Sequence, residues 1–465
     1  MNANSIANTA LSALQNAQAG INLTSQNVNG QAVAGYTRRK LDIATEQVMG
    51  NGAPLLGSGV SVNGFSREWS ALLQQQRVTQ AGTTAFNGTV ADGLASLDRQ
   101  AADATLALDK PVNDFFTSLA TLARKPNDAA AISALRTQGG VLLNAAQQYQ
   151  DGISAVQRNA RGALSTSVEQ LNNIASELAV INRDIVTSQG SGGAGPAPAE
   201  LDRRDALLLQ AGGLVGGDLG LNADGQAYVF VGGQPLVNGG TAATLKITQQ
   251  DPSGKAPIAL SMQFGTPGQT APPVGVALAS DALAGTMGGQ LKLASDPFLV
   301  LQPNGHPDPS LAPMTDLMSA AAGQPAKPGA SLLMEALSAL GAFRAMKAPT
   351  DADRVALDKS LQALAAQANS TDAHTSAGAM QSTLLGGWRA FVGNLGSAVN
   401  EHKSAQAASA AVETRLNADF QSQSGVNLDE EAANLMRYQQ SYAAASKLLQ
   451  ASGTLLDQLL AIVGR

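Results

Sequence analysis

Apolar residues recur every seven positions along the C-terminal segment, from Ser424 to Arg465. The repeating residues are Leu428, Leu435, Tyr442, Leu449, Leu456 and Val463. A period of seven keeps side chains on one slowly drifting face of an α-helix. The positions four residues further on are mostly small or polar, beginning with Ala432, Gln439 and Ser446. The pattern therefore predicts a helix of roughly 55 Å with a narrow apolar stripe that needs a partner helix.

The start of this helix is marked by polar residues. Asn427 is a suitable N-cap, and Glu430 follows it three residues later. Asp429, Glu430 and Glu431 also place negative charge at the positive end of the helix dipole. We therefore expect the helix to begin at Asn427.

The N-terminal segment carries a second seven-residue repeat. Its members are Ala7, Leu14, Ile21 and Val28. The pattern predicts a helix from about Asn4 to Asn29 that stops at Gly30, because glycine is a common C-terminal stop. Two amphipathic helices at the extreme ends of one chain are natural partners for each other, although two helices of an ordinary bundle would give the same pattern.

Helical spacing also dominates two long internal segments. Apolar residues at intervals of three and four run from about Val141 to Ser188 and again from Thr375 to Phe420. We expect these helices, of similar length, to pair antiparallel in a rod. The residues between the first helix and the rod, from Leu41 to Val62, alternate in the manner of an extended arm or a small β-hairpin.

The middle of the chain has a different pattern. Short alternating runs separated by glycine and proline predict strands, and residues 302–330 are proline-rich and read as a loop. Helices are predicted again at Ser331–Lys347 and Asp351–Ala368, the second capped by Thr350. The predicted strands are Tyr228–Val231, Leu245–Ile247, Ile258–Phe264 and Gly289–Leu293.

These elements predict a mainly α fold with an inserted β-rich domain. The long antiparallel helical rod is built from both chain ends, and the terminal helices form a coiled-coil-like inner segment. The β domain is expected at the far end of the rod. The expected domains are a terminal segment (1–35 and 425–465), a helical rod (36–190 and 375–424) and an outer β-rich domain (191–374) with a helical insertion at about 331–370.

The composition is typical of an elongated molecule whose surface is largely covered by neighbouring molecules. The 465 residues exceed what one core normally holds, and hydrophobic content is 44% while aromatic content is only 4%. Charged residues make up 14%, against about a quarter in an ordinary globular protein. The net charge of −6 argues against nucleic-acid or acidic-membrane partners. No apolar run is long enough to span a membrane, and no cleavable signal peptide is recognisable.

The sequence offers no candidate catalytic, cofactor-binding or metal site. Cysteine is absent, and the three histidines, His306, His374 and His402, have no partner at metal-ligand spacing. The charged run Asp202–Asp205 is expected to form salt bridges on a short surface helix. The basic run Arg38–Lys40 is too short for nucleic acid and is expected to contact a neighbouring subunit. We therefore predict that the protein is not an enzyme.

Several stretches resemble one known family. Residues 425–440, GVNLDEEAANLMRYQQ, and the following SYAAASKLLQASGTLLDQLL are similar to the C-terminus of the flagellar hook-associated protein 1 family. The Asn-rich Ser25–Arg39, SQNVNGQAVAGYTRR, resembles the N-terminal motif of that family. The segments Ser167–Ile185 and Glu200–Leu208 agree in the same order, whereas the middle of the chain resembles the family only at Gly288–Asp296.

The resemblance implies a structural protein that joins hook to filament in the bacterial flagellum. It implies terminal helices inside a tube, self-association, contacts with the hook protein and the second junction protein, and an export chaperone on the C-terminal helix. The protein would be extracellular and delivered by the flagellar type III exporter without a cleaved signal. Another axial protein of hook or rod type, or a structural protein of a secretion apparatus, is the alternative. The ten residues of the two stripes are the expected assembly and chaperone surface, and no cofactor is expected.

Overall fold

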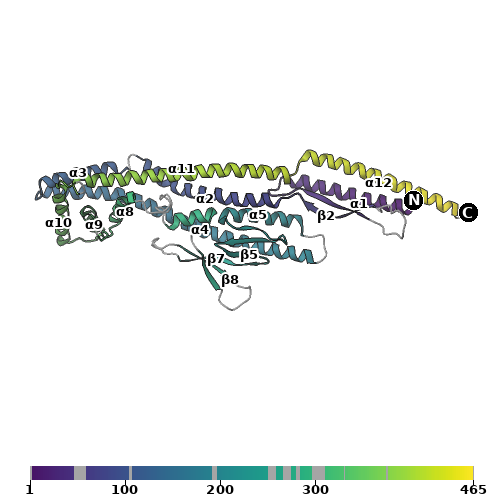
Figure 1. Ribbon diagram of the computed structural model, residues 1–465, viewed down its shortest axis with the longest axis horizontal. Coiled ribbons are helices and arrows are strands. Elements are labelled where there is room, and N and C mark those ends of the chain that lie inside the picture. Colours follow the sequence, from purple (N-terminus) through teal and green to yellow (C-terminus); the bar gives the residue numbers. More distant parts are fainter. Residues whose placement is uncertain are drawn as a thin grey trace.

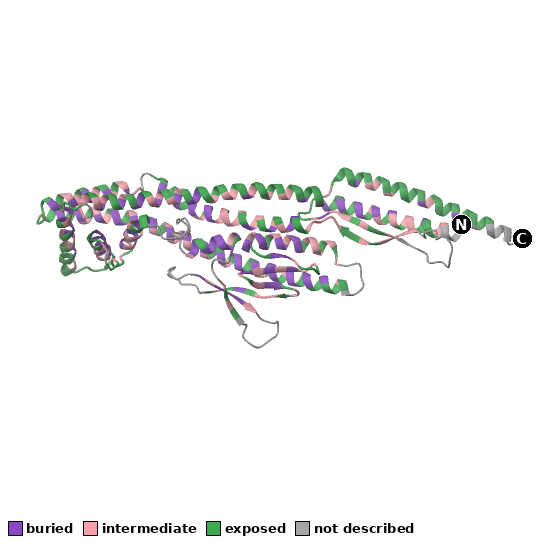
Figure 2. Ribbon diagram, in the orientation of Figure 1, coloured by how far each residue is buried: buried purple, intermediate pink, exposed green. Residues whose placement is uncertain are grey.

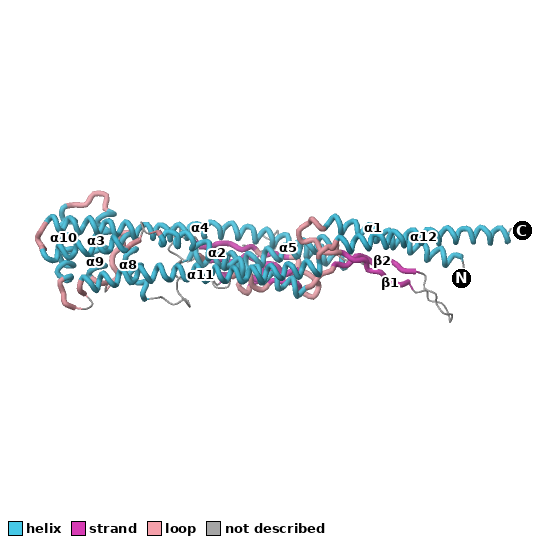
Figure 3. Tube along the Cα trace, turned by 90° about the horizontal axis from the view of Figure 1, so that it is seen from above, coloured by secondary structure: helices cyan, strands magenta, loops and turns pink. Residues whose placement is uncertain are grey.

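The chain forms one long, narrow body with both termini at the same end (Figures 1 and 3). This computed structural model describes most of the sequence. The described residues are 3–46, 59–103, 107–190, 196–249, 258–264, 274–278, 283–295, 309–328, 330–372 and 375–463.

A rod of long helices runs away from the terminal end. α2 (Ala71–Ala102) and α11 (Ala377–Ser424) lie side by side in opposite directions. Arg77 near the start of α2 donates from Nε to Asn417 Oδ1 near the end of α11, at 2.9 Å. Further along, His402 Nδ1 lies 2.8 Å from Asn87 Oδ1. The predicted antiparallel rod is therefore confirmed.

The pairing inside the rod differs from the one predicted. α4 (Ala129–Gly190) runs in the same direction as α11, and the long antiparallel partner of α11 is α2. The expected pairing of the 141–188 and 375–420 helices was therefore wrong. Length suggested the match, but the connection decides it. α3 (Asp109–Arg124) continues outward antiparallel to α11, and the chain reverses only at residues 125–128, before α4 begins.

An aromatic cluster joins α4 to α11 near the far end. The ring of Tyr149 lies 4.9 Å from that of Trp388 and 6.1 Å from that of Phe391. Trp388 Nε1 donates to Asp109 Oδ2 at 3.1 Å, which ties in α3. Aromatic pairs at such distances add stability beyond their buried area. Aromatic residues, which are scarce in this chain, therefore lie together where α3, α4 and α11 meet.

The core is one continuous cluster that follows the rod and the elements packed on it. Its described members extend from Val78 to Val399 along the sequence and are mostly leucine and alanine. Figure 2 shows the buried residues as stripes on the facing sides of the long helices. A stripe of this kind lets a thin bundle bury apolar area without a thick interior.

Two small antiparallel sheets lie beside the terminal-side half of the rod, against α4 and α5 (Pro198–Val215). Amide side chains of α4 hold them. Asn182 donates to the carbonyls of Ala227 and Gly239, and Asn172 pairs with both backbone groups of Leu245. The first sheet contains β3 (Leu219–Leu221), β4 (Ala227–Val231), β5 (Gln234–Asn238) and β6 (Thr241–Ala242), and the second contains β7 (Thr244–Gln249), β8 (Ala259–Phe264) and β9 (Val274–Leu278).

Three of the four predicted strands are present, as β4, β7 and β8, but the fourth is a helix. Residues 289–293 lie in α6 (Gly285–Ser295), which packs against α2. A Cβ at Gly289 would lie 2.9 Å from Thr89 Cβ, so glycine is what permits the close approach. In the sequence, the glycines at 288–289 suggested the boundary of a strand. In the structure, they let a helix of small residues pack closely against its neighbour.

The far end of the rod carries a group of short helices. The loop prediction for residues 302–330 was wrong at 309–321, because η3 (Pro309–Leu311) and α8 (Ala312–Ala321) occupy those residues. Each begins with a turn that contains proline, where the missing N–H costs no helical hydrogen bond. Residues 322–328 are turns and coil as predicted, and 302–308 lie outside the described part. α9 (Leu332–Ala345) and α10 (Asp351–Ala368) follow as predicted, and Thr350 and Asp353 form the expected capping box. The helices therefore occupy the far end, and the sheets lie alongside the rod instead.

The terminal end contains two helices and a hairpin. α1 (Ala3–Gly30) and α12 (Leu428–Val463) pack antiparallel, close to their predicted limits. Asn427 Oδ1 accepts from the backbone of Asp429 at 2.9 Å, which confirms the predicted cap. The predicted hairpin is also present, as β1 (Arg39–Glu46) paired with β2 (Gly59–Arg67) along α1; residues 47–58 lie outside the described part.

Tyr149 gives a prediction for the rod in alkali. Burial, followed by the negative charge of Asp103, raises the pKa of Tyr149 to about 12 from 10.0. The unfolded chain therefore loses this proton first, and the rod loses stability as the pH rises from about 10 to about 12. We expect Tyr149→Phe to remove about 1.4 kcal/mol of the loss between pH 8 and pH 11, which urea denaturation at those two pH values would measure. Tyr442→Phe, at an exposed position, is the control, and equal losses in wild type and Tyr149→Phe would contradict the prediction.

Candidate functional site

Small side chains fill the contact between α1 and α12. The residues most deeply buried there include Ala10 and Ala17 on α1 and Ala445 and Ser452 on α12, each at most 2% exposed. They recur at intervals of seven, three residues after the members of the predicted stripes. The seven-residue period of both helices is therefore present, but the side that the helices turn towards each other is the small-residue side.

Gly20 allows the two backbones to approach closely. A Cβ on Gly20 would lie 2.5 Å from ring carbons of Tyr438, so the tyrosine ring lies directly over the glycine. Gly30 accommodates the ring of Tyr36 in the same way at the end of α1. Larger residues at either glycine would push an aromatic ring out of its site.

The predicted stripe residues lie at the flank of this contact. Leu428, Tyr442, Leu449 and Val28 are 44%, 43%, 37% and 41% exposed. Ala7, Leu14, Ile21 and Leu435 are partly buried. The side chains of Leu456 and Val463 lie outside the described part of the chain. The pair therefore leaves much of the predicted stripe uncovered.

Other large apolar residues of the pair are also exposed. Leu11, Met436, Leu448 and Leu455 have exposed fractions of 49%, 58%, 52% and 46%. They were not among the predicted residues, because they fall outside the seven-residue series of their helices. The doubled leucines at 448–449 and 455–456 are the sequence signal that could have revealed a wider apolar surface. We call Leu428, Met436, Tyr442, Leu448, Leu449 and Leu455 the outer row of α12.

Asn27 organises the turn that follows α1. It is 1% exposed, and its amide donates to the Arg39 carbonyl while its oxygen accepts from Arg39 N and from the Tyr36 hydroxyl. The distances are 3.0, 3.1 and 2.9 Å. One buried amide therefore fixes where β1 starts relative to α1.

Arg38 connects this turn to the start of α12. Its Nε lies 2.7 Å from Glu431 Oε1, and its Nη1 lies 2.7 Å from Glu430 Oε2 and 3.4 Å from Glu68 Oε2. Burial disfavours the charged guanidinium, but the hydrogen bond and charge of Glu431, with Glu68 and Glu430, outweigh it and raise the pKa of Arg38. Lys40 also pairs with Glu68, and Arg39 with Asp202. The described partners of this basic run lie in the same chain, and its expected contact with a neighbouring subunit stays a prediction.

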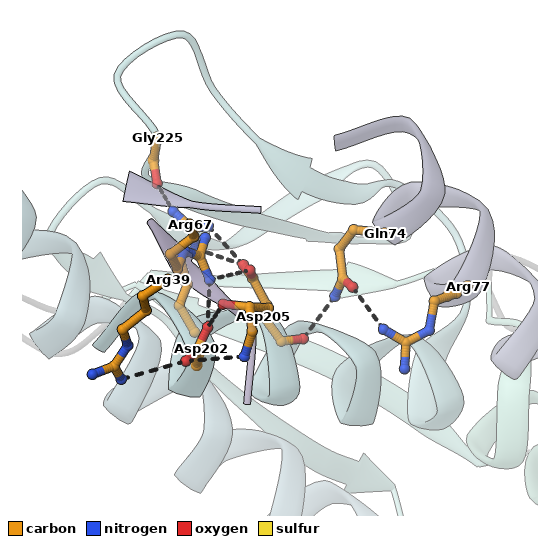
Figure 4. A network of polar contacts seen from close by, with 9 residues as sticks. Arg39, Arg67, Gln74, Arg77, Asp202, Asp205 and Gly225 are labelled. Carbon is orange, nitrogen blue, oxygen red and sulfur yellow. Dashed lines mark hydrogen bonds and ion pairs between the residues drawn. The ribbon is translucent and has the colours of Figure 1, made fainter. Parts of the chain in front are cut away.

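A second ionic cluster connects β2 to α5 (Figure 4). Arg67 Nη1 lies 2.8 Å from Asp202 Oδ1 and 3.0 Å from Asp205 Oδ2, and Thr37 Oγ1 donates to Asp202 Oδ1. Arg204 binds Asp205 on the other side, and its burial lowers its pKa although Asp205 opposes this. The predicted salt bridges are present, but Arg204 and Asp205 are buried and not on the surface, at 3% and 7% exposed.

The described residues offer little for catalysis. No group of three or more histidine, cysteine, aspartate or glutamate side chains that could hold a metal ion occurs among them. His402 packs beside Phe86, and burial followed by the charge of Lys292 lowers its pKa, so it is neutral near pH 7. His306 and His374 lie outside the described residues. Within that same part of the chain, none of the helices has the length and apolar character needed to cross a bilayer.

Comparison with known proteins identifies the family. Residues 94–322 match the model "Flagellar hook-associated protein FlgK helical domain". The chain is 27% identical to flagellar hook-associated protein 1 of Escherichia coli (strain K12) over 552 aligned residues, which cover 98% of this chain and all of that protein. The chain belongs to the flagellar hook-associated protein 1 family.

Other relatives match over shorter lengths. The hook-associated protein 1 of Salmonella typhimurium is 32% identical over 244 residues, covering 52% of this chain and 44% of that protein. Residues 418–462 match a second model, "Flagellar basal body rod FlgEFG protein C-terminal". The hook junction protein FlgK of Burkholderia pseudomallei has a TM-score of 0.43 and 22% identity over 54% of this chain and 42% of that one.

Family membership makes the chain a structural protein of the bacterial flagellum and not an enzyme. The segments that resemble the family in sequence meet in space. Asn27 and Arg38 lie in the N-terminal motif, Glu430 and Glu431 in the C-terminal motif, and Asp202 and Asp205 in Glu200–Leu208. All three segments contribute to the two ionic clusters or to the turn between them.

The glycine contact gives a prediction for the terminal pair. Alanine at position 20 or position 453 should favour helix by a similar amount, about 1 kcal/mol. A Cβ at Gly453 has no neighbour within 4 Å, whereas one at Gly20 meets the Tyr438 ring. We expect Gly20→Ala to speed hydrogen exchange of backbone amides in α1 and α12, and Gly453→Ala not to do so. Slower exchange in both variants would mean that the two helices do not pack as described.

Proposed function

We propose that this protein joins the hook to the filament as a junction subunit and polymerises through its terminal helices. The observation that carries the proposal is the outer row of α12, whose described members are between 37% and 58% exposed. Several large exposed apolar side chains on a helix that is already paired are typical of a protein-binding surface. Family membership and the length of the match to the E. coli relative support the same role.

The proposed partners follow from this surface. Copies of the chain would cover the outer row of α12 and the exposed residues of α1, which include Leu11 and Val28. The hook protein would lie on one side of the resulting ring or helical assembly and the second junction protein on the other. The stripe residues of both helices, from Ala7 to Val28 and from Leu428 to Val463, are the proposed assembly surface.

A hook or rod protein is the alternative function. The match of residues 418–462 to the basal-body rod model favours it, because that segment contains nearly all of α12. The match of residues 94–322 to the hook-associated helical domain favours the junction, and it covers far more of the chain. The tail is thus similar to that of other axial proteins, and the rod region distinguishes the junction protein from them. Electron microscopy of flagella from a strain that lacks this chain separates the two: detached filaments on complete hooks support a junction role, and absent hooks support the alternative.

The outer row gives a prediction for assembly. Leu449→Asp should abolish filament attachment in that strain, because it places a charge where a neighbouring subunit needs an apolar contact. Thermal unfolding of the rod should not change, since α12 packs on α1 and not on the rod core. Gln450→Asp, an exposed neighbour with the same added charge, is the control and should retain motility. If both variants assemble equally well, the outer row is not an assembly surface.

The seven-residue stripe of α12 is a hazard before assembly, and we propose that a cytoplasmic chaperone shields it until type III export. Helix-in-groove binding suits a row of anchors about two turns apart, with Leu435, Tyr442, Leu449 and Leu456 as the proposed contacts. Because the same face takes part in polymerisation, chaperone binding and assembly should exclude each other.

A pull-down with the chaperone gives the corresponding prediction. A chain truncated at Gly425 should lose binding, because the whole of α12 is removed, while residues 40–425 remain folded by circular dichroism. The full-length Gln450→Asp variant should still bind and serves as the control. Undiminished binding of the truncated chain would place the chaperone site elsewhere.

A further inference from the structure

Apolar packing of the rod stops before the terminal pair. The continuous core has no described member before Val78 or after Val399. The buried apolar residues of the pair, Ala10, Ala17, Leu23 and Ala445, lie outside that core. Among the described elements, α12 packs chiefly on α1, and α1 packs on α12 and the hairpin. Other contacts must therefore hold the pair at its angle to the rod.

Polar contacts of a few residues provide this connection. On the rod side, Arg67 of β2 binds Asp202 and Asp205 of α5, and the three side chains are 7%, 11% and 9% exposed. The Asp205 carbonyl accepts from Gln74 Nε2 of α2 at 2.8 Å, which ties α5 to the rod (Figure 4). Arg67 therefore binds carboxylates of α5, and α5 is itself fixed to the rod.

On the side of the terminal pair, Arg38 performs the equivalent role. Its backbone nitrogen donates to the Ser424 carbonyl at the end of α11, at 2.8 Å. Its side chain binds Glu430 and the buried Glu431 at the start of α12. The break between α11 and α12 is only three residues long, from Gly425 to Asn427. Arg38 therefore spans the bend at which the chain leaves the rod.

Ion pairs of this kind fix geometry more sharply than apolar contacts do. A guanidinium is planar and bonds a carboxylate in a narrow range of directions. When the groups are buried, loss of one partner leaves a charge that water cannot reach, so the local arrangement is abandoned. An apolar contact could slide to a new angle, but this joint has one arrangement that satisfies its charges.

We propose that Arg38 and Arg67 are positioning residues that set the angle between the α1/α12 pair and the rod. Their ion pairs, and not apolar packing, fix the direction in which the outer row is presented to neighbouring subunits. The use of the outer row by neighbouring subunits rests on the function proposed above. The fixed angle does not depend on that function.

The test measures the angle in the unassembled full-length chain. The chain contains no cysteine, so spin labels can be placed at two engineered cysteines without other changes. One label replaces exposed Arg415 near the end of α11, and the other replaces exposed Arg437 on α12. We expect a narrow distance distribution, and we expect Arg67→Gln and Arg38→Gln each to broaden it at least twofold.

Two controls distinguish loss of the ion pairs of Arg38 and Arg67 from a general loosening of the chain. Arg203→Gln makes the same charge change on α5, next to Asp202, but breaks an exposed pair with Glu177 and should leave the distribution narrow. A second label pair, at Asn22 and Arg437, should stay narrow in every variant, because α1 and α12 move together. Arg38→Gln is the safer variant, since the side-chain partners described for Arg38 lie outside the long rod helices.

Unchanged distributions in both Arg67→Gln and Arg38→Gln would overturn the proposal. So would unfolding of the rod in both variants by circular dichroism, because the arginines would then be part of the rod's stability. The result is independent of assembly: failure of Leu449→Asp to affect filament attachment would remove the proposed function and leave the fixed angle in place.

Discussion

The close approach of α1 and α12 determines what the rest of the terminal segment can do. Gly20 and a series of alanine and serine residues let the backbones come together, with Tyr438 as the large side chain that lies over the glycine. A buried alanine removes little apolar area from water, whereas full burial of a leucine is worth about 1.5–3 kcal/mol. Ordering each residue costs about 1–2 kcal/mol. The pair therefore has little stability of its own and gains most when neighbouring molecules cover the larger side chains on its outside.

The rod follows a different rule. Its helices bury leucine along their whole facing sides, with the aromatic cluster of Tyr149, Trp388 and Phe391 at one end. The rod core is complete within one chain, whereas the terminal pair leaves large apolar side chains exposed. The ionic joint lies at the boundary between these two regions, where neither kind of apolar packing extends. Directional charge contacts suit that position, because they hold an angle without needing a large buried surface.

Much of the fold could be predicted from the sequence, because local signals are strong in long helices. The seven-residue repeats, the Asn427 cap and the Thr350 capping box placed several helix ends within a residue or two. The partner of α11 could not be predicted, because α2 and α4 both have helical periodicity and both are long enough to lie along much of α11. α6 was missed because glycine at a helix–helix contact looks the same in sequence as glycine at a turn.

The seven-residue period of the terminal helices was predicted, but the residues that pack against each other within the chain were not. The repeat identifies a face, yet the residues that pack inside the chain, Ala10, Ala17 and Ala445, are offset by three from the larger ones. Small residues carry a weak signal, since alanine is common throughout this sequence. The ion pairs of Arg38 with Glu430 and Glu431 join residues almost four hundred positions apart, and no local pattern encodes such a contact.

The central claim is that the outer row of α12 is left exposed in the monomer for neighbouring subunits to cover. A high-resolution electron cryomicroscopy map of the assembled hook–filament junction tests it most directly. The account predicts that Tyr442, Leu448 and Leu449 are buried against helices of adjacent copies, while Ala10, Ala17 and Ala445 keep their contact within the chain. An assembly in which the outer row faces solvent, with neighbours joined through other surfaces, would contradict it.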